Sequence, residues 1–178
     1  MHKSFIVSNT DELARLEQTV LKSMDKTAAQ IKSEISVSSS HALFVKMKFG
    51  GVGFDPLDLD RELNVIEQIN QSFTYLASLY ALEILFAKYP HLAPFRLNLG
   101  TAPGSDIESE CGELTAEVFA SVTPTNNQKL KNDIDKVMET NAKFKFAFFI
   151  SPNYELGRQP QLERGNVIVW ALKGARVL

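Results

Sequence analysis

The sequence lacks the features that would place this protein in several specialised classes. Its 178 residues include a single cysteine, Cys111, so no disulfide can form within the chain. No apolar run approaches the roughly 20 residues that a membrane-spanning helix requires, and the short apolar stretch 5–7 does not resemble a signal peptide. We therefore expect a cytoplasmic protein without a membrane partner.

The chain also lacks an excess of positive charge and the common ligand-binding motifs. Lysine and arginine total 19 against 21 acidic residues, so any nucleic-acid binding would have to come from a local basic patch. The three histidines, His2, His41 and His91, are too scattered for a zinc site or a Cys/His nucleophile. The glycines form neither a Walker loop nor a GxGxxG cradle for phosphates.

What is present is the composition of an ordinary globular domain, with 44% hydrophobic and 22% charged residues. Apolar residues recur every three or four positions from about 11 to 35, from about 59 to 88 and from about 127 to 140, which predicts three helices. Shorter apolar, β-branched or aromatic runs predict strands at 42–49, 95–99, 144–150 and 167–172. This order predicts an α/β fold, a mixed β-sheet flanked by helices.

The segment 106–117 predicts a β-hairpin that carries many carboxylates. If Cys111 and Gly112 form its turn, the facing pairs are Glu110 with Glu113, Glu108 with Thr115 and Asp106 with Glu117. Two acids facing each other repel, and the pair furthest from the turn needs a positive partner or a raised pKa. Two interpretations remain open: a solvated acidic face opposite an apolar one, or a site for a divalent metal ion.

The order of elements around this hairpin resembles the PD-(D/E)XK, or restriction-endonuclease-like, nuclease superfamily. The resemblance covers roughly residues 59–150: a helix with an acid, three strands that carry an Asp and a Glu, a helix and a further strand. Asp106, in Gly104-Ser105-Asp106, corresponds to the family's first acid, and Glu117-Val118-Phe119 to its (D/E)XK element. Glu67 on the preceding helix resembles an additional acid of some members.

The resemblance implies a nuclease that uses Mg²⁺ or Mn²⁺, with Glu67, Asp106 and Glu117 as metal ligands. Mg²⁺ binds oxygen ligands at about 2.0 to 2.1 Å and keeps several waters, so few protein carboxylates suffice. Such ions activate water and neutralise the charge that develops on an attacked phosphate. Nucleic acid, DNA above all, is the implied partner.

One departure from the family pattern concerns its lysine. This chain has Phe119 there, and an aromatic ring cannot donate hydrogen bonds to water or phosphate. Lys129 and Lys131, in the next helix, are candidates for a migrated catalytic lysine, and Gln128 could instead orient water.

The expected organisation is a single domain over 1–178, with an N-terminal helix and strand extension at 1–58 and a restriction-endonuclease-like core at 59–178. The leading hypothesis is a metal-dependent nuclease. The alternative is a catalytically inactive member that acts as an interaction or regulatory module, with its first helix available to form a homodimer. The low pI, about 5.9, and Phe119 favour the alternative, whereas Glu67, Asp106 and Glu117 favour the enzyme.

Overall fold

The computed structural model describes residues 2–174, and these form two compact units. The first, here called the sheet unit, comprises the chain up to Leu13 and again from Leu76 onward. The second unit comprises Ala14–Tyr75. The strand β1 (His2–Val7), which lies within the expected extension 1–58, belongs to the sheet unit.

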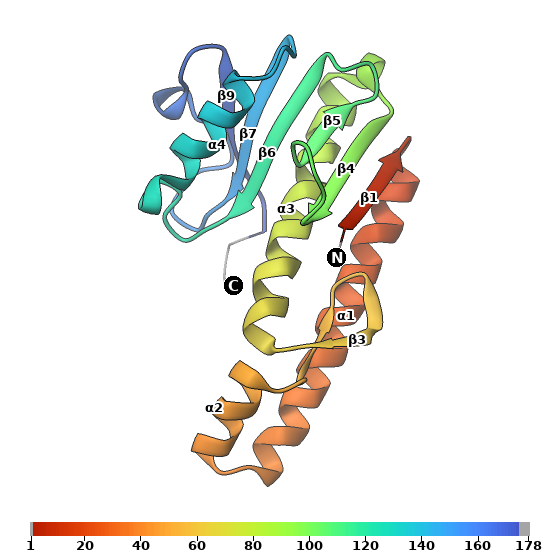
Figure 1. Ribbon diagram of the computed structural model, residues 1–178, viewed down its shortest axis with the longest axis vertical. Helices are drawn as coiled ribbons and strands as arrows, with labels where there is room; N and C mark the ends of the chain where they lie inside the picture. Colours follow the sequence, from red (N-terminus) through yellow and green to blue (C-terminus); the bar gives the residue numbers. More distant parts are fainter. Residues whose placement is uncertain (1, 175–178) are drawn as a thin grey trace. The chain divides into compact units, whose positions relative to one another are not determined.

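The sheet unit is built on one seven-stranded mixed sheet with the order β1-β4-β5-β6-β7-β9-β8 (Figure 1). The first four strands in that order run antiparallel to their neighbours, whereas β6, β7 and β9 are parallel to one another. Strand β8 returns antiparallel at the far edge. The bounds are β4 (Phe95–Gly100), β5 (Ile107–Ser109), β6 (Leu114–Ala120), β7 (Phe144–Ile150), β8 (Gly157–Arg158) and β9 (Val167–Leu172).

One face of the sheet is covered by α4 (Lys129–Met138), the crossover between the parallel strands β6 and β7. Leu130, Ile134 and Val137 of this helix are buried, as the three- and four-residue spacing predicts. They join a core cluster whose strand residues alternate along β6, β7 and β9: Phe119, Ala147, Phe149, Val167, Val169 and Ala171. Met138, which continues the same three- and four-residue spacing, is 43% exposed because it ends the helix.

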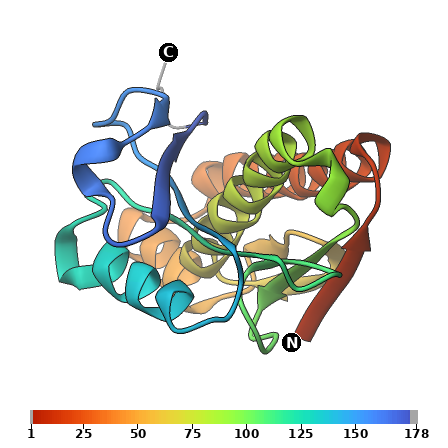
Figure 2. The ribbon, with the colours of Figure 1, turned by 90° about the horizontal axis from the view of Figure 1, so that it is seen from above.

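The opposite face is covered by the second half of α3 (Val65–Lys88), so that the sheet lies between two helices (Figure 2). The rings of Phe86 and Phe95 meet edge to face with centroids 5.1 Å apart. Tyr89 packs against Phe146 of the central strand at 5.4 Å. The structure thus confirms the predicted mixed α/β architecture with helices on both faces.

The second unit contains most of α1 (Thr10–Val37) together with α2 (Ser40–Phe49), the strands β2 (Gly53–Asp55) and β3 (Asp58–Leu63), and the first part of α3. The buried Gln68 of α3 joins these elements. Its Oε1 accepts a hydrogen bond from Phe54 N at 2.7 Å, and its Nε2 donates to Ser23 O at 3.2 Å. Asn9 caps α1 by accepting hydrogen bonds from the backbone N–H groups of residues 11 and 12.

Two local predictions were wrong. Residues 42–49 form a helix instead of a strand, because Ser39 caps the segment by accepting from Ala42 N at 3.4 Å. A short apolar run does not distinguish the two structures. Helix α3 begins at Val65, whereas the sequence predicted a helix from about 59. The difference arises because Asp58–Leu63 forms the strand β3, which pairs with β2. Strand β1 was not foreseen at all.

None of the helices formed by residues 2–174 combines the length and the apolarity that crossing a bilayer would require.

Candidate functional site

The β5–β6 hairpin sets the position of the two candidate carboxylates. Strand β5 pairs with β6 through Ile107 opposite Ala116 and Glu108 opposite Thr115, the register predicted from the sequence. The connection is longer than the expected two-residue turn, because the strands end at residues 109 and 114 and Gly112 N donates to Ser109 O at 2.9 Å. Gly112 does adopt the positive φ expected of it, +75°.

Asp106 and Glu117 come together at the open end of this hairpin. Asp106 immediately precedes β5 and reaches across to β6, where its Oδ2 accepts a hydrogen bond from Val118 N at 2.7 Å. Glu117 is only 4% exposed. Side chains alternate along a strand, so Glu117 shares the face of Phe119, which is the face that α4 covers. Two acids therefore lie beside each other in a largely buried place.

A lysine from α4 neutralises this pair. Lys136 Nζ lies 2.7 Å from Glu117 Oε1 and donates a hydrogen bond to Gly104 O at 3.0 Å. Lys136 is thus the charge partner of the buried Oε1 of Glu117. The Lys136 side chain is 49% exposed and thus connects the buried carboxylate to the surface.

The electrostatics of the site match what the sequence led us to expect of the deep pair. Burial, followed by the negative charge of Glu117, raises the pKa of Asp106 from 3.8 to about 7. The Val118 N–H, Lys136 and Lys129 lower the pKa of Asp106, but by less than burial and Glu117 raise it. Burial alone would lower the pKa of Lys136, but the pairing with Glu117 outweighs it and the pKa is raised. The pair thus has both a raised pKa and a positive partner.

A third buried acid, Asp133, lies on α4 next to this group. It is 4% exposed, and its Oδ1 accepts a hydrogen bond from Lys129 Nζ at 2.5 Å, whereas Oδ2 is buried without a hydrogen-bond partner. Burial raises its pKa, and the charge of Glu117 adds to that effect. Lys129 Nζ also lies 5.4 Å from the ring centroid of Phe119.

Sequence reasoning missed both Lys136 and Asp133, although a signal for each was present. Asp133 follows Leu130 by three positions and precedes Val137 by four, so it shares the apolar stripe that points at the sheet. Lys136 lies one turn further along the helix. An acid within an inward stripe indicates a buried cation nearby, because an unpaired buried charge is costly.

The other predicted site residues lie elsewhere. Lys131 is exposed and contacts Gln128, with Nζ 3.4 Å from Oε1. Glu67 belongs to the second unit, where its Oε1 accepts from Gln71 Nε2 at 3.0 Å. Across residues 2–174, no group of three or more His, Cys, Asp or Glu side chains is arranged to hold a metal ion.

The arrangement can perform two kinds of chemistry. The two carboxylates offer oxygen ligands of the kind that hard cations take, and a cation there would relieve their mutual repulsion. The ammonium group of Lys136 can stabilise an anion that approaches the same place. Comparison of this chain with protein-family models, with curated proteins and with solved structures finds no match.

Proposed function

We propose that this protein is a Mg²⁺- or Mn²⁺-dependent hydrolase of nucleic-acid phosphodiesters with a restriction-endonuclease-like core. The order α3, β4, β5, β6, α4, β7 supports this proposal, since a helix, a three-strand meander, a helix and a parallel strand follow one another as in that superfamily. Asp106 immediately precedes β5 and Glu117 lies in the middle of the neighbouring strand β6, over which α4 packs.

The observation that carries the proposal is the buried pair of Asp106 and Glu117 with Lys136 beside it. Two carboxylates that repel each other in a largely buried site favour binding of a divalent cation, because the cation would attract both and so offset their repulsion. Such an ion, held together with water and a substrate phosphate, supplies an activated water and charge neutralisation.

Lys136 takes the role that the family assigns to the lysine at the position of Phe119. Its ammonium group is held at Glu117 from α4 and can hydrogen-bond a phosphate oxygen or the attacking water. Lys129, bound to Asp133, adds positive charge on the same helix. Lys131 is exposed and would contact the substrate backbone only. The proposal does not depend on Glu67.

The test begins with calorimetric titration of Mn²⁺ and Mg²⁺ into metal-free protein at about pH 8, where Asp106 is ionised. We expect Asp106→Asn and Glu117→Gln to abolish binding. Glu113→Gln is the matched control, because Glu113 lies on the same hairpin but is exposed. Absence of binding to the wild type refutes the metal site.

Cleavage assays on single-stranded, duplex and branched DNA and on RNA complete the test. We expect Lys136→Met to lower kcat by about a hundredfold or more while metal affinity is retained, since a donor that acts on developing charge contributes on that scale. Equal cleavage by wild type and Glu117→Gln would assign any activity to a contaminant.

A second candidate function, an interaction module that forms a homodimer, is favoured by one observation in the second unit. No residue of α2 is buried, and Phe44 and Phe49 are 70% and 79% exposed. Near the end of α1, Ile35 and Val37 are 58% and 77% exposed. Phe44 and Phe49 line one apolar hollow together with Val45 and Ile66, and an exposed apolar surface of this kind is typical of an interface.

This candidate predicts a concentration-dependent dimer in analytical ultracentrifugation. The double substitution of Phe44 and Phe49 by serine should give a monomer that still binds Mn²⁺. A wild type that stays monomeric at every concentration contradicts the dimer.

A further inference from the structure

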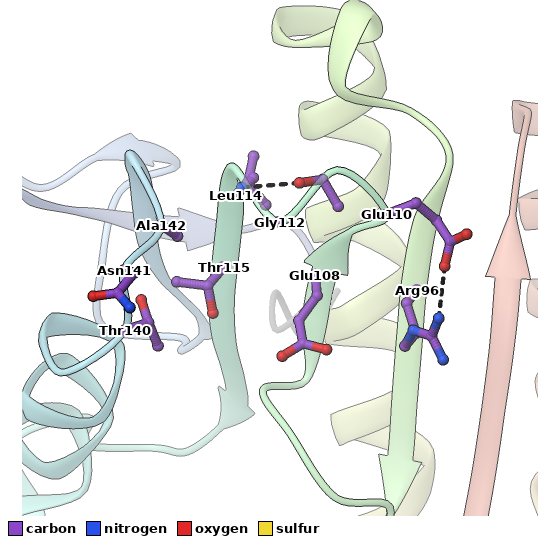
Figure 3. A pocket seen from close by; sticks show the side chains of 10 residues that line it. Arg96, Glu108, Glu110, Gly112, Leu114, Thr115, Thr140, Asn141 and Ala142 are labelled. Carbon is purple, nitrogen blue, oxygen red and sulfur yellow. Dashed lines mark hydrogen bonds and ion pairs between the residues drawn. The ribbon is translucent and has the colours of Figure 1, made fainter.

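A cavity of about 340 Å³ opens beside the candidate site (Figure 3). It lies between the β5–β6 hairpin and the loop that joins α4 to β7. Glu108 and Thr115 contribute from the two hairpin strands, and Thr140 and Asn141 from the loop. Arg96 of β4 and Glu110 also line the cavity. This volume falls within the range of about 300 to 1,000 Å³ typical of small-molecule sites.

The cavity wall contains a polar group that lacks a partner. Thr115 is 3% exposed, and its hydroxyl oxygen is buried without a hydrogen-bond partner. Figure 3 shows this side chain between Glu108 on one side and Thr140 on the other. A buried hydroxyl left without a partner costs free energy comparable to a lost hydrogen bond, so a ligand that supplies the partner binds with that gain.

The charges around the cavity determine which ligands it can accept. Arg96 is already paired with Glu110, with Nη2 2.7 Å from Oε1. Glu108 opens onto the cavity, and one of its oxygens accepts from Ser105 N at 3.3 Å. An arginine that is neutralised, next to a further carboxylate, repels a phosphate and attracts hydrogen-bond donors. The amino and imino groups of nucleobases and the hydroxyls of a sugar are donors of this kind.

The position of the cavity connects it to the acidic pair. Thr115 and Glu117 are two residues apart on β6, so their side chains lie on the same face of the sheet about 7 Å apart along the strand. A phosphate bound by Lys136, and by a metal ion on Glu117 as proposed above, would therefore have its attached nucleoside within reach of Thr115. On this basis, and resting on the function proposed above, we propose that the cavity binds the nucleoside adjoining the scissile phosphate, through Thr115 and Glu108.

The experiment uses neutral nucleosides as probes, because they carry no phosphate for the metal site. The full chain, freed of metal with a chelator, is titrated with adenosine, guanosine, cytidine, uridine and thymidine while amide resonances are followed by NMR. We expect saturable shifts at residues 108–115 and 140–142 with at least one nucleoside. Thr115→Val and Glu108→Gln should each weaken that affinity about tenfold, the loss of one hydrogen bond.

Three controls keep the result decisive. Glu113→Gln should bind as the wild type does, because its side chain is exposed on the same hairpin. Asn141→Ala gives a second cavity variant in the loop if Thr115→Val proves unfolded by its NMR spectrum, and it should also weaken binding. Inorganic phosphate should produce no shift in the cavity, and a saturable phosphate shift there would overturn the assignment.

The outcomes separate this proposal from the proposed function. Asp106→Asn should retain nucleoside binding, so binding without any cleavage by the wild type would sustain the cavity assignment and refute the hydrolase. Cleavage by a wild type that binds no nucleoside, or whose binding is unchanged in Thr115→Val and Glu108→Gln, would refute the cavity assignment alone.

Discussion

Replacing Asp106 by asparagine should make the metal-free protein more stable at alkaline pH than the wild type. The aspartate is held in a largely buried place beside Glu117, and its pKa is raised from 3.8 to about 7. Asparagine has nearly the same shape and can still accept the hydrogen bond from Val118 N through its carbonyl oxygen. The substitution therefore removes the costly charge and leaves the hairpin intact.

The sign and size of the effect follow from proton linkage. An acid whose pKa is higher in the folded state stabilises the fold most at low pH, below its unfolded pKa. That contribution is lost as the pH rises through the folded pKa. With pKa values of 3.8 and about 7, the free energy of unfolding of the wild type loses about 3 kcal/mol between about pH 5 and about pH 8 from this group. Because Lys136 and water can move toward the ionised pair and stabilise it, we expect the measured loss in the free energy of unfolding to be about 1 to 3 kcal/mol.

The assay is urea denaturation of both proteins in chelator at the two pH values. The ionisable groups distant from residue 106 contribute nearly equally to both proteins, so the difference between the two free energies of unfolding reports on residue 106 and its neighbours Glu117 and Lys136. We expect that difference to shift in favour of Asp106→Asn as the pH rises. Glu113→Gln, with its exposed side chain, should show no such shift. A stability difference that does not depend on pH, or that favours the wild type at high pH, would refute the burial of Asp106 beside Glu117.

Three further predictions test the same site and its support. Lys136→Met should destabilise the fold by about 1 to 3 kcal/mol at neutral pH, because it leaves the buried Glu117 without its cation. Lys136→Arg should recover most of that loss. Urea denaturation measures both variants, and equal stability of the two would contradict the ion pair. Phe119→Lys, which places a lysine where the proposed nuclease resemblance has one, should cost about 3 kcal/mol or more and give no gain in cleavage. The reason is that this position is 4% exposed and its ring lies 5.9 Å from that of Phe149. A stable, more active variant in urea denaturation and cleavage assays would contradict this prediction. Gly112→Ala should lower the free energy of unfolding by about 1 kcal/mol in thermal denaturation, because of its positive φ alone, since a Cβ there would meet no atom within 4 Å. A loss of several kcal/mol would indicate a contact that the structure does not contain.

The sequence was sufficient for features that depend on neighbours along the chain. Strands β7 and β9 begin and end at the predicted residues. Their dense aromatic and β-branched runs favour a strand, and the turn residues on either side end it. The register of Glu108 with Thr115 followed from the position of Gly112. The start of α1 lies within a residue or two of the predicted position, because Asn9 caps the helix with its own side chain. In each case the deciding interaction joins residues close in sequence.

Tertiary structure decided what depends on distant partners. The run 42–49 has no buried residue, so apolar content alone could not distinguish helix from strand there. Strand β1 exists because β4 pairs with it some 90 residues later, from Val7 with Phe95 to His2 with Gly100. Lys136 became the partner of Glu117 through the packing of α4 on the sheet. The pKa of Asp106 rises because folding withdraws water from two acids that sequence alone could place on facing strands but could not bury.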